Sequence, residues 1–137
     1  GIIHRDASSL RNIIHTLRKG GMVALVADQE AGDNGIKVNF FGHPISPPKG
    51  SVAFALKTKS AMCCAHSSRK DNRNIVTMED IIWPIRRSEN NEDDIRHWTQ
   101  VALDTLENAI RRSPGEYMWM HKRFKTYMPE IYQDMED

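Results

Sequence analysis

One apolar run, residues 22–27 (MVALVA), limits the possible folds of this chain more than any other segment. Gly20 and Gly21 precede the run, and Asp28 follows it directly. A continuous apolar run without polar alternation predicts a strand that is buried on both faces, as in a parallel sheet. Ligands of open α/β sheets bind beyond the carboxyl ends of the strands, so the acid at Asp28 marks a candidate site. An Asx turn or a helix cap is the purely structural alternative for Asp28.

A second buried strand is predicted over residues 61–65 (AMCCA), and a helix over residues 50–58 precedes it. Strand, helix and strand in this order form a βαβ unit. The polar residues that follow predict a hairpin turn, and residues 74–79 predict the returning antiparallel strand. The predicted fold class is therefore α/β with a mixed sheet. Residues 28–48 are loop by composition, and a loop of this length in a compact domain is often functional.

Two more helices are predicted from apolar spacing and from the residues at their ends. The first follows Ser8 or Ser9 and ends before the two glycines, with an apolar stripe of Leu10, Ile13, Ile14 and Leu17. The second spans residues 92–112, and its acidic first turn and basic last turn suit the helix dipole. Its predicted apolar face consists of Ile95, Trp98, Ala102, Leu106, Ala109 and Ile110.

The composition predicts a packed domain, because 39% of the residues are hydrophobic and 27% are charged. A net charge of only +1 leaves nucleic-acid and membrane partners undecided. The two cysteines, Cys63 and Cys64, are adjacent, which argues against a disulfide framework and favours a reducing compartment. No apolar run approaches the roughly 20 residues that span a bilayer. The chain begins at Gly1 rather than at Met, so we expect a fragment or a processed product.

Three groups of residues have both a functional and a structural interpretation. His66 and Asp71 have a spacing at which a carboxylate can orient a catalytic imidazole, but the polar residues between them favour a surface turn. Phe40 and Phe41 fit either a membrane-facing or acyl-facing wedge or an anchor that packs the loop onto the body. The cations Lys122, Arg123 and Lys125 alternate with Trp119, Phe124 and Tyr127. They fit a site for phosphate groups or an anionic membrane surface, or a last helix with its aromatic side chains in the core.

Three blocks of sequence together resemble one known family. They are LRKGGMVALVADQEAG, VNFFGHPISPPKGSVAFALKTKSAM and NAIRRSPGEYMWMHKRFKT. The first block contains a predicted strand that ends in Asp-Gln, and the second contains Phe-Phe-Gly followed by Pro-x-Gly. The third contains the closing motif W-x-H-x-R-F-K. In this order they resemble the bacterial lipid A biosynthesis acyltransferases of the lauroyl/myristoyl type, within the lysophospholipid acyltransferase superfamily. The resemblance covers roughly residues 2–126.

The resemblance implies a fold and a reaction. Residues 1–137 would form a single partial domain, the C-terminal part of a mixed-sheet, glycerolipid-acyltransferase-like α/β domain with flanking helices. Members of the family transfer a fatty acyl group from acyl carrier protein or acyl-CoA to a hydroxyl of a lipid A precursor. They act at the cytoplasmic face of the inner membrane. The implied partners are these donors and a lipid A precursor or another glycolipid acceptor, and neither a cofactor, a metal nor a nucleic acid is expected.

The resemblance also implies roles for individual residues. Arg5 matches a basic position that contacts an acceptor phosphate or the oxyanion, and Asp28 matches an acid that shapes the acceptor site. These two residues are the catalytic candidates. The residues implied to bind substrate are Gln29, Phe40, Phe41, Lys49 and Arg123.

Two departures from the family pattern limit the prediction. The family's catalytic His-x-x-x-x-Asp/Glu and its N-terminal transmembrane anchor match positions upstream of Gly1, so we expect this chain alone to be inactive. Ala27 stands where the family often has Pro before Asp-Gln, which leaves the acceptor open. One alternative is acylation of another glycolipid, such as a phosphatidylinositol mannoside. The other is a noncatalytic lipid- or protein-binding remnant of the fold.

Overall fold

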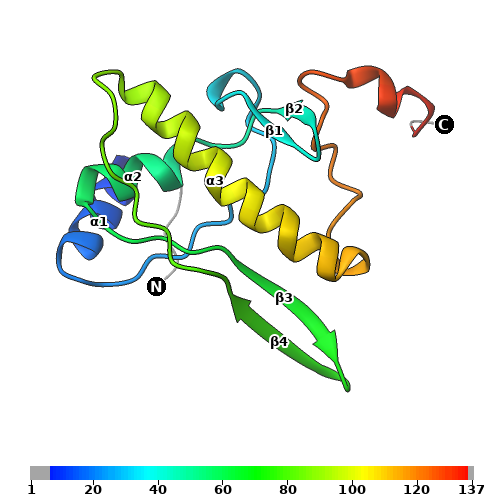
Figure 1. Ribbon diagram of the computed structural model, residues 1–137, viewed down its shortest axis with the longest axis horizontal. Helices are drawn as coiled ribbons and strands as arrows, with labels where there is room; N and C mark the ends of the chain where they lie inside the picture. The colour runs from blue at the N-terminus through cyan, green and yellow to red at the C-terminus, as the bar shows by residue number, and fades with distance from the viewer. Residues whose placement is uncertain (1–6, 136–137) are drawn as a thin grey trace.

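The computed structural model describes residues 7–135 and shows a small α/β fold (Figure 1). Its helices are α1 (Ala7–Arg18), α2 (Gly50–Thr58) and α3 (Asn91–Arg112). Its strands form two antiparallel pairs, β1 (Val38–Phe40) with β2 (His43–Ile45), and β3 (Ala65–Lys70) with β4 (Arg73–Met78). Short 3-10 turns span Gly32–Asn34, Pro114–Glu116 and Pro129–Met135. The α/β class is confirmed.

All three predicted helices are present, and the bounds of α2 and α3 are within one residue of the prediction. Helix α1 begins at Ala7, so Ser8 and Ser9 lie inside it and the prediction that one of them caps it is wrong. Helix α3 begins after Asn90, whose side-chain oxygen accepts a hydrogen bond from the Glu92 backbone N–H at 2.9 Å. Acids occupy its first turn and arginines its last turn, as the helix dipole favours. The buried face differs from the predicted one, because Thr99 and Leu103 are buried while Trp98 and Leu106 are only half-buried. Contacts with α2 and β1 decide which face of α3 is buried, and the spacing of apolar residues in the sequence does not reveal these contacts.

The predicted loop over residues 28–48 contains a short hairpin, so that prediction is wrong for β1 and β2. Val38 pairs with Ile45 and Phe40 pairs with His43. Phe41 and Gly42 form the tip, with φ angles of 50° and 83°. Two positive φ angles are typical of the tight turn that matches the twist of paired strands. The alternation of buried Val38 and Phe40 with exposed Asn39 was present in the sequence, but the run is too short to identify a strand.

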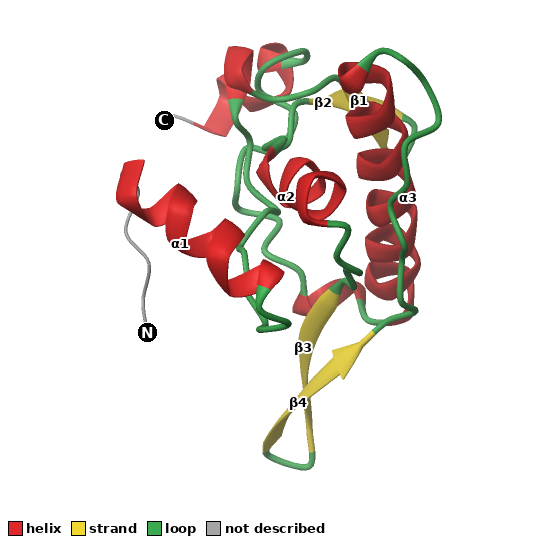
Figure 2. Ribbon diagram, turned by 90° about the vertical axis from the view of Figure 1, so that its left-hand side faces the viewer, coloured by secondary structure: helices red, strands yellow, loops and turns green. Residues whose placement is uncertain are grey.

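The second hairpin confirms the predicted returning strand and corrects the strand before it. Residues 61–65 do not form a buried strand; Met62 makes an isolated bridge to Ile82, and β3 begins only at Ala65. Asp71 and Asn72, with φ angles of 49° and 61°, form a two-residue turn. The hairpin extends away from the helices in both views (Figures 1 and 2). Every residue of β4 is therefore exposed.

Residues 22–27 are extended but do not form a strand, which corrects the central prediction from the sequence. Met22 is 84% exposed and Val26 is 82% exposed. Among residues 7–135, no backbone hydrogen bond joins this segment to another. A strand needs a neighbour for its N–H and C=O groups, and the described residues supply none here. The βαβ unit and the mixed sheet are therefore not formed by the described part of the chain.

The core lies where β1, β2, α2 and the inner face of α3 meet. Figure 2 shows α2 between α1 and α3, and both neighbours contact it. The buried apolar side chains of this core are Ile36, Val38, Phe40, Ile45, Val52, Leu56, Ile95, Leu103 and Ile110. The C-terminal segment adds Tyr117 and Phe124 from its irregular backbone. The alternative of a last α-helix for this segment is wrong, although its prediction of aromatic packing is confirmed for Phe124.

Candidate functional site

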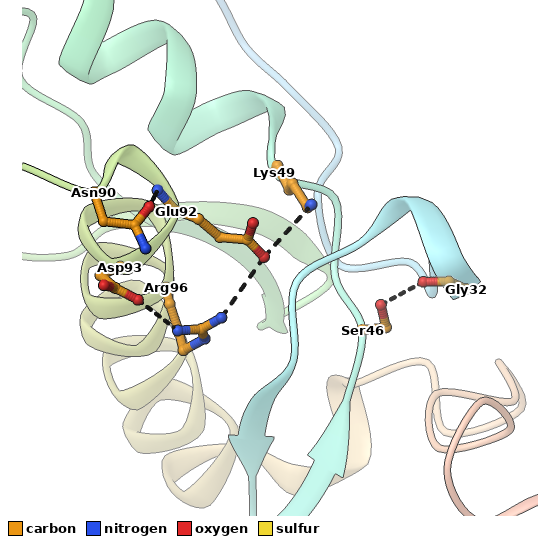
Figure 3. A network of polar contacts seen from close by, with 7 residues as sticks. All are labelled: Gly32, Ser46, Lys49, Asn90, Glu92, Asp93 and Arg96. Carbon is orange, nitrogen blue, oxygen red and sulfur yellow. Dashed lines mark hydrogen bonds and ion pairs between the residues drawn. The ribbon is translucent and has the colours of Figure 1, made fainter.

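The acidic turn (residues 28–30) lies against the β1–β2 hairpin. Both carboxylate oxygens of Glu30 accept a hydrogen bond from the Ser46 backbone N–H, each at 3.2 Å. The Ser46 hydroxyl in turn donates to the Gly32 carbonyl at 2.5 Å (Figure 3). Asp28 is half-buried, and Gln29 between the two acids is exposed. The turn is thus fixed to the hairpin through Glu30, which leaves the Asp28 carboxylate without a hydrogen bond among the described residues.

The C-terminal segment reaches the same turn from the opposite end of the chain. The Glu30 backbone N–H donates to Nε2 of His121 at 3.0 Å, across 91 positions of sequence. The Arg123 N–H donates to the His121 carbonyl at 2.6 Å. His121 therefore joins the W-x-H-x-R-F-K segment to the acidic turn in one local structure. The tertiary fold brings Asp28 and Arg123, both predicted site residues, into this structure.

Arg123 is a buried cation with no hydrogen-bond partner among the described residues. It is 2% exposed, and Nε, Nη1 and Nη2 all lack an acceptor. Its guanidinium carbon lies 5.5 Å from the centre of the Phe40 ring, a cation–π contact. Burial lowers the pKa of the Arg123 guanidinium, while the negative charges of ionised Tyr117, Asp28 and Glu30 act in the opposite direction. The acids of the turn thus lie close enough to stabilise the charge of Arg123.

The aromatic side chains around Arg123 fix its surroundings. Phe40 is fully buried and its ring meets Phe41 edge-on, with centroids 4.7 Å apart. The Phe41 backbone N–H donates to Oε1 of Glu107 at 2.7 Å, and Arg111 lies 4.8 Å above the Phe41 ring. The interpretation of the Phe-Phe pair as an anchor that packs the loop onto the body is confirmed for Phe40. Phe41, at the half-buried tip, packs against Trp119 at a centroid distance of 5.9 Å.

The remaining predicted site residues are Arg5 and Lys49. Arg5 is outside the described residues. Lys49 precedes α2, and its Nζ lies 3.9 Å from Oε1 of Glu92, which also pairs with Arg96 (Figure 3). No described hydrogen bond or ion pair joins Lys49 to Asp28 or Arg123. The structure therefore brings Asp28, Phe40, Phe41 and Arg123 together and places Lys49 in a separate polar network. Gln29 follows Asp28 in the chain, and its side chain is exposed.

Three residues of the site, Glu30, His121 and Tyr117, were not among the predicted site residues. Glu30 connects the acidic turn to both the hairpin and His121, and Tyr117 lies in the buried surroundings of Arg123. Burial raises the pKa of Tyr117, and the positive charge of Arg123 acts in the opposite direction. The cluster of acids after residues 22–27 was a usable signal for Glu30. Nothing in the local sequence distinguishes Tyr117 from the other aromatic residues near the C-terminus.

His66 and Asp71 do not form a pair, and the surface turn that the sequence favoured is confirmed. His66 lies on β3 with its Nδ1 3.2 Å from Oε1 of Glu79, whereas Asp71 lies in the turn of the hairpin. Glu79 also pairs with Arg112 of α3. Within residues 7–135, no group of His, Cys, Asp and Glu side chains is arranged to bind a metal. No helix in the same range has both the length and the apolar character to cross a bilayer.

Comparisons with known proteins agree with this local structure. The family model of the bacterial lipid A biosynthesis acyltransferases matches residues 1–126, which include the acidic turn, the hairpin and the W-x-H-x-R-F-K segment. The chain belongs to this family. Similar proteins are a lipid A biosynthesis palmitoleoyltransferase of Escherichia coli (strain K12) and a lipid A biosynthesis acyltransferase of Shigella flexneri. Each is 27% identical over 125 residues, which are 87% of this chain and 38% of the relative.

The family assignment confirms the resemblance inferred from the three sequence blocks. The chain spans 38% of the length of these relatives.

Proposed function

We propose that the protein containing this chain transfers a fatty acyl group from acyl carrier protein or acyl-CoA to a hydroxyl of a lipid A precursor. The observation that carries the proposal is the family match over residues 1–126. The names of the two relatives, both lipid A biosynthesis acyltransferases, support the same reaction class. The reaction forms an ester to the acceptor oxygen, breaks the acyl thioester and leaves a free thiol on the donor.

The residues of the site divide into two proposed roles. Asp28 positions the acceptor, and its half-buried carboxylate without a described hydrogen bond supports this role. Arg5, Gln29, Phe41 and Lys49 contact substrate, as their positions in the family pattern suggest. The base that takes the hydroxyl proton belongs to the family's His-x-x-x-x-Asp/Glu pair, outside residues 1–137, and neighbouring donors stabilise the oxyanion.

We also propose that the protein acts at the cytoplasmic face of the inner membrane. In support, Met118 and Met120 are 70% and 89% exposed, on either side of Trp119. Residues 117–129 contain no acid, and Lys122 and Lys125 follow the apolar side chains. Apolar and aromatic side chains beside lysines are typical of segments that lie at an anionic membrane surface.

The mixed sheet is proposed for the longer protein. The exposure of Met22 and Val26 supports a further strand beside residues 22–27, because such apolar surface is costly in water. Oxidation of Met22 by peroxide tests this idea. We expect slower formation of Met22 sulfoxide in a protein of the relatives' length than in the 137-residue chain, and equal rates would contradict it.

Genetic rescue tests the reaction. A strain that lacks the gene is complemented with the full-length gene or with its Asp28→Asn variant, and lipid A is analysed by mass spectrometry. We expect the wild-type gene to restore one acyl chain. Asp28→Asn should lower the transfer rate by about tenfold, as for one lost charge-assisted hydrogen bond. An unchanged lipid A profile in the deletion strain would reject the proposed acceptor and favour another glycolipid or a noncatalytic protein.

A further inference from the structure

We propose that His121 and Arg123, here named the C-terminal clasp, are positioning residues that place the acidic turn for acceptor binding. The inference rests on the proposed function. It gives the closing W-x-H-x-R-F-K segment a defined task, in which the clasp acts on the substrate through Asp28.

The first observation is the direction of the hydrogen bond between the turn and the clasp. The Glu30 N–H is the donor, so Nε2 of His121 must offer its lone pair, and the ring proton must lie on Nδ1. Among the hydrogen bonds between described residues, this bond is the only one in which a backbone group of residues 28–30 takes part. The Glu30 side chain is bonded separately to Ser46. Loss of His121 as an acceptor would therefore free the backbone next to Asp28 while the hairpin contact remains.

The second observation is that the burial of Arg123 is poorly explained by packing. A buried guanidinium whose nitrogens lack acceptors lowers stability, and an apolar side chain of similar volume would avoid that cost. The negative charges that act on Arg123 are those of ionised Tyr117 and then of Asp28 and Glu30 in the turn. In a buried setting such attraction is weakly screened. The Arg123 backbone N–H also donates to the carbonyl of His121, the residue that bonds the turn, at 2.6 Å. The guanidinium is thus held beside the clasp contact and has no exposed nitrogen with which to contact a substrate.

Substitution of His121 in the full-length enzyme tests the hydrogen bond. His121→Leu removes the acceptor, His121→Gln supplies a side-chain oxygen, and His15→Leu makes the same change at an exposed histidine of α1. We expect His121→Leu to lower kcat/KM for the acceptor by about 3- to 10-fold, the range of one net hydrogen bond. The KM for the acyl donor should not change. His121→Gln should recover most of the loss, and His15→Leu should match wild type.

Arg123 is tested against Asp28 by a double-mutant cycle. Arg123→Met should reduce activity while the urea midpoint stays equal or rises, because the buried unpaired charge is removed. In the Asp28→Asn background, Arg123→Met should have a smaller effect, because the two residues act on the same acceptor contact. Additive losses, or a fall in stability that explains the loss of activity, would overturn the role of Arg123.

Hydrogen exchange separates failure of the clasp from failure of the proposed function. The amide of Glu30 should exchange about 3- to 10-fold faster in His121→Leu than in wild type, and His121→Gln should restore its protection. This result is independent of any enzymatic activity. Equal exchange in all three proteins would overturn the inference even if the enzyme acylates lipid A. Faster exchange without any acyl transfer would support the clasp and reject the proposed reaction.

Discussion

Gly35 occupies a position at which the backbone leaves no room for a side chain. A Cβ atom there would lie 2.2 Å from the Ser46 hydroxyl and 2.5 Å from the Ser46 carbonyl oxygen. Ser46 is also the residue that bonds Glu30, so the close approach of residues 35 and 46 helps to set the acidic turn. The requirement for glycine therefore comes from a contact rather than from a positive φ angle.

We expect Gly35→Ala to lower the free energy of unfolding by about 1–3 kcal/mol, as overpacking does at a close contact. Gly115→Ala is the matched control, because a Cβ at Gly115 would meet no atom within 4 Å. Its effect should stay within about 0.5 kcal/mol. Urea unfolding followed by circular dichroism measures both variants. Similar losses in the two variants would contradict the contact with Ser46.

Cys64 should be an unreactive thiol. Its S–H donates to the Ala102 carbonyl at 3.2 Å, and burial raises its pKa to about 11, with smaller contributions from Cys63 and Glu79. Because the thiolate is the nucleophile, alkylation of Cys64 in a Cys63→Ser variant should be about 100-fold slower at pH 8 than in the urea-unfolded chain. The rate should rise with pH up to about pH 11. A rate that levels off below pH 9 would contradict the raised pKa.

Helix α3 begins at a side-chain cap, and this local feature was available in the sequence. Asn90 caps the helix, while Asn91 is an exposed first helical residue with no described side-chain bond. We expect Asn90→Ala to lower the free energy of unfolding by about 1 kcal/mol. Asn91→Ala should change it by less than about 0.5 kcal/mol, since alanine is a good helix former. If thermal unfolding gives equal shifts for both variants, the cap does not stabilise α3.

The helices were predictable because the residues that determine a helix are close together in the sequence. Residues three and four positions apart share a helix face, and the capping residues lie within the next turn. The strands were harder to predict, since a strand requires a partner. Residues 22–27 have a more strand-like composition than β1, yet β1 pairs with β2, whereas residues 22–27 pair with none of the described residues. Alternation over three residues was too short a signal for β1.

The whole molecule has little net charge, but residues 117–129 are both apolar and basic. If this segment faces a membrane, the 137-residue chain should float with vesicles that contain phosphatidylglycerol and less with phosphatidylcholine alone. High salt should weaken binding, because screening reduces the attraction of lysines to anionic lipids. Replacement of Met118 and Met120 by Glu should weaken binding by at least about tenfold, given the apolar area that each would bury.

The control is replacement of Val76 and Met78 by Glu; these two side chains lie on β4, outside residues 117–129, and are 69% and 60% exposed. This variant should bind vesicles as wild type does. Equal losses in the two double variants would indicate a general response to added negative charge and would contradict a membrane contact at residues 118–120.

The sequence alone predicted the positions of the helices, the β3–β4 turn and the family resemblance, because each depends on residues that are close together in the chain. The acidic loop after residues 22–27 was also a recognisable candidate. The site required the fold, because its contacts join segments as far apart as Glu30 and His121, and pairing of that kind leaves no local pattern. The burial of Arg123 beside Phe40 also joins distant segments of the chain and leaves no local pattern in the sequence. The free energy of a buried charge depends on the groups that surround it in space, and those groups come together only when the chain has packed.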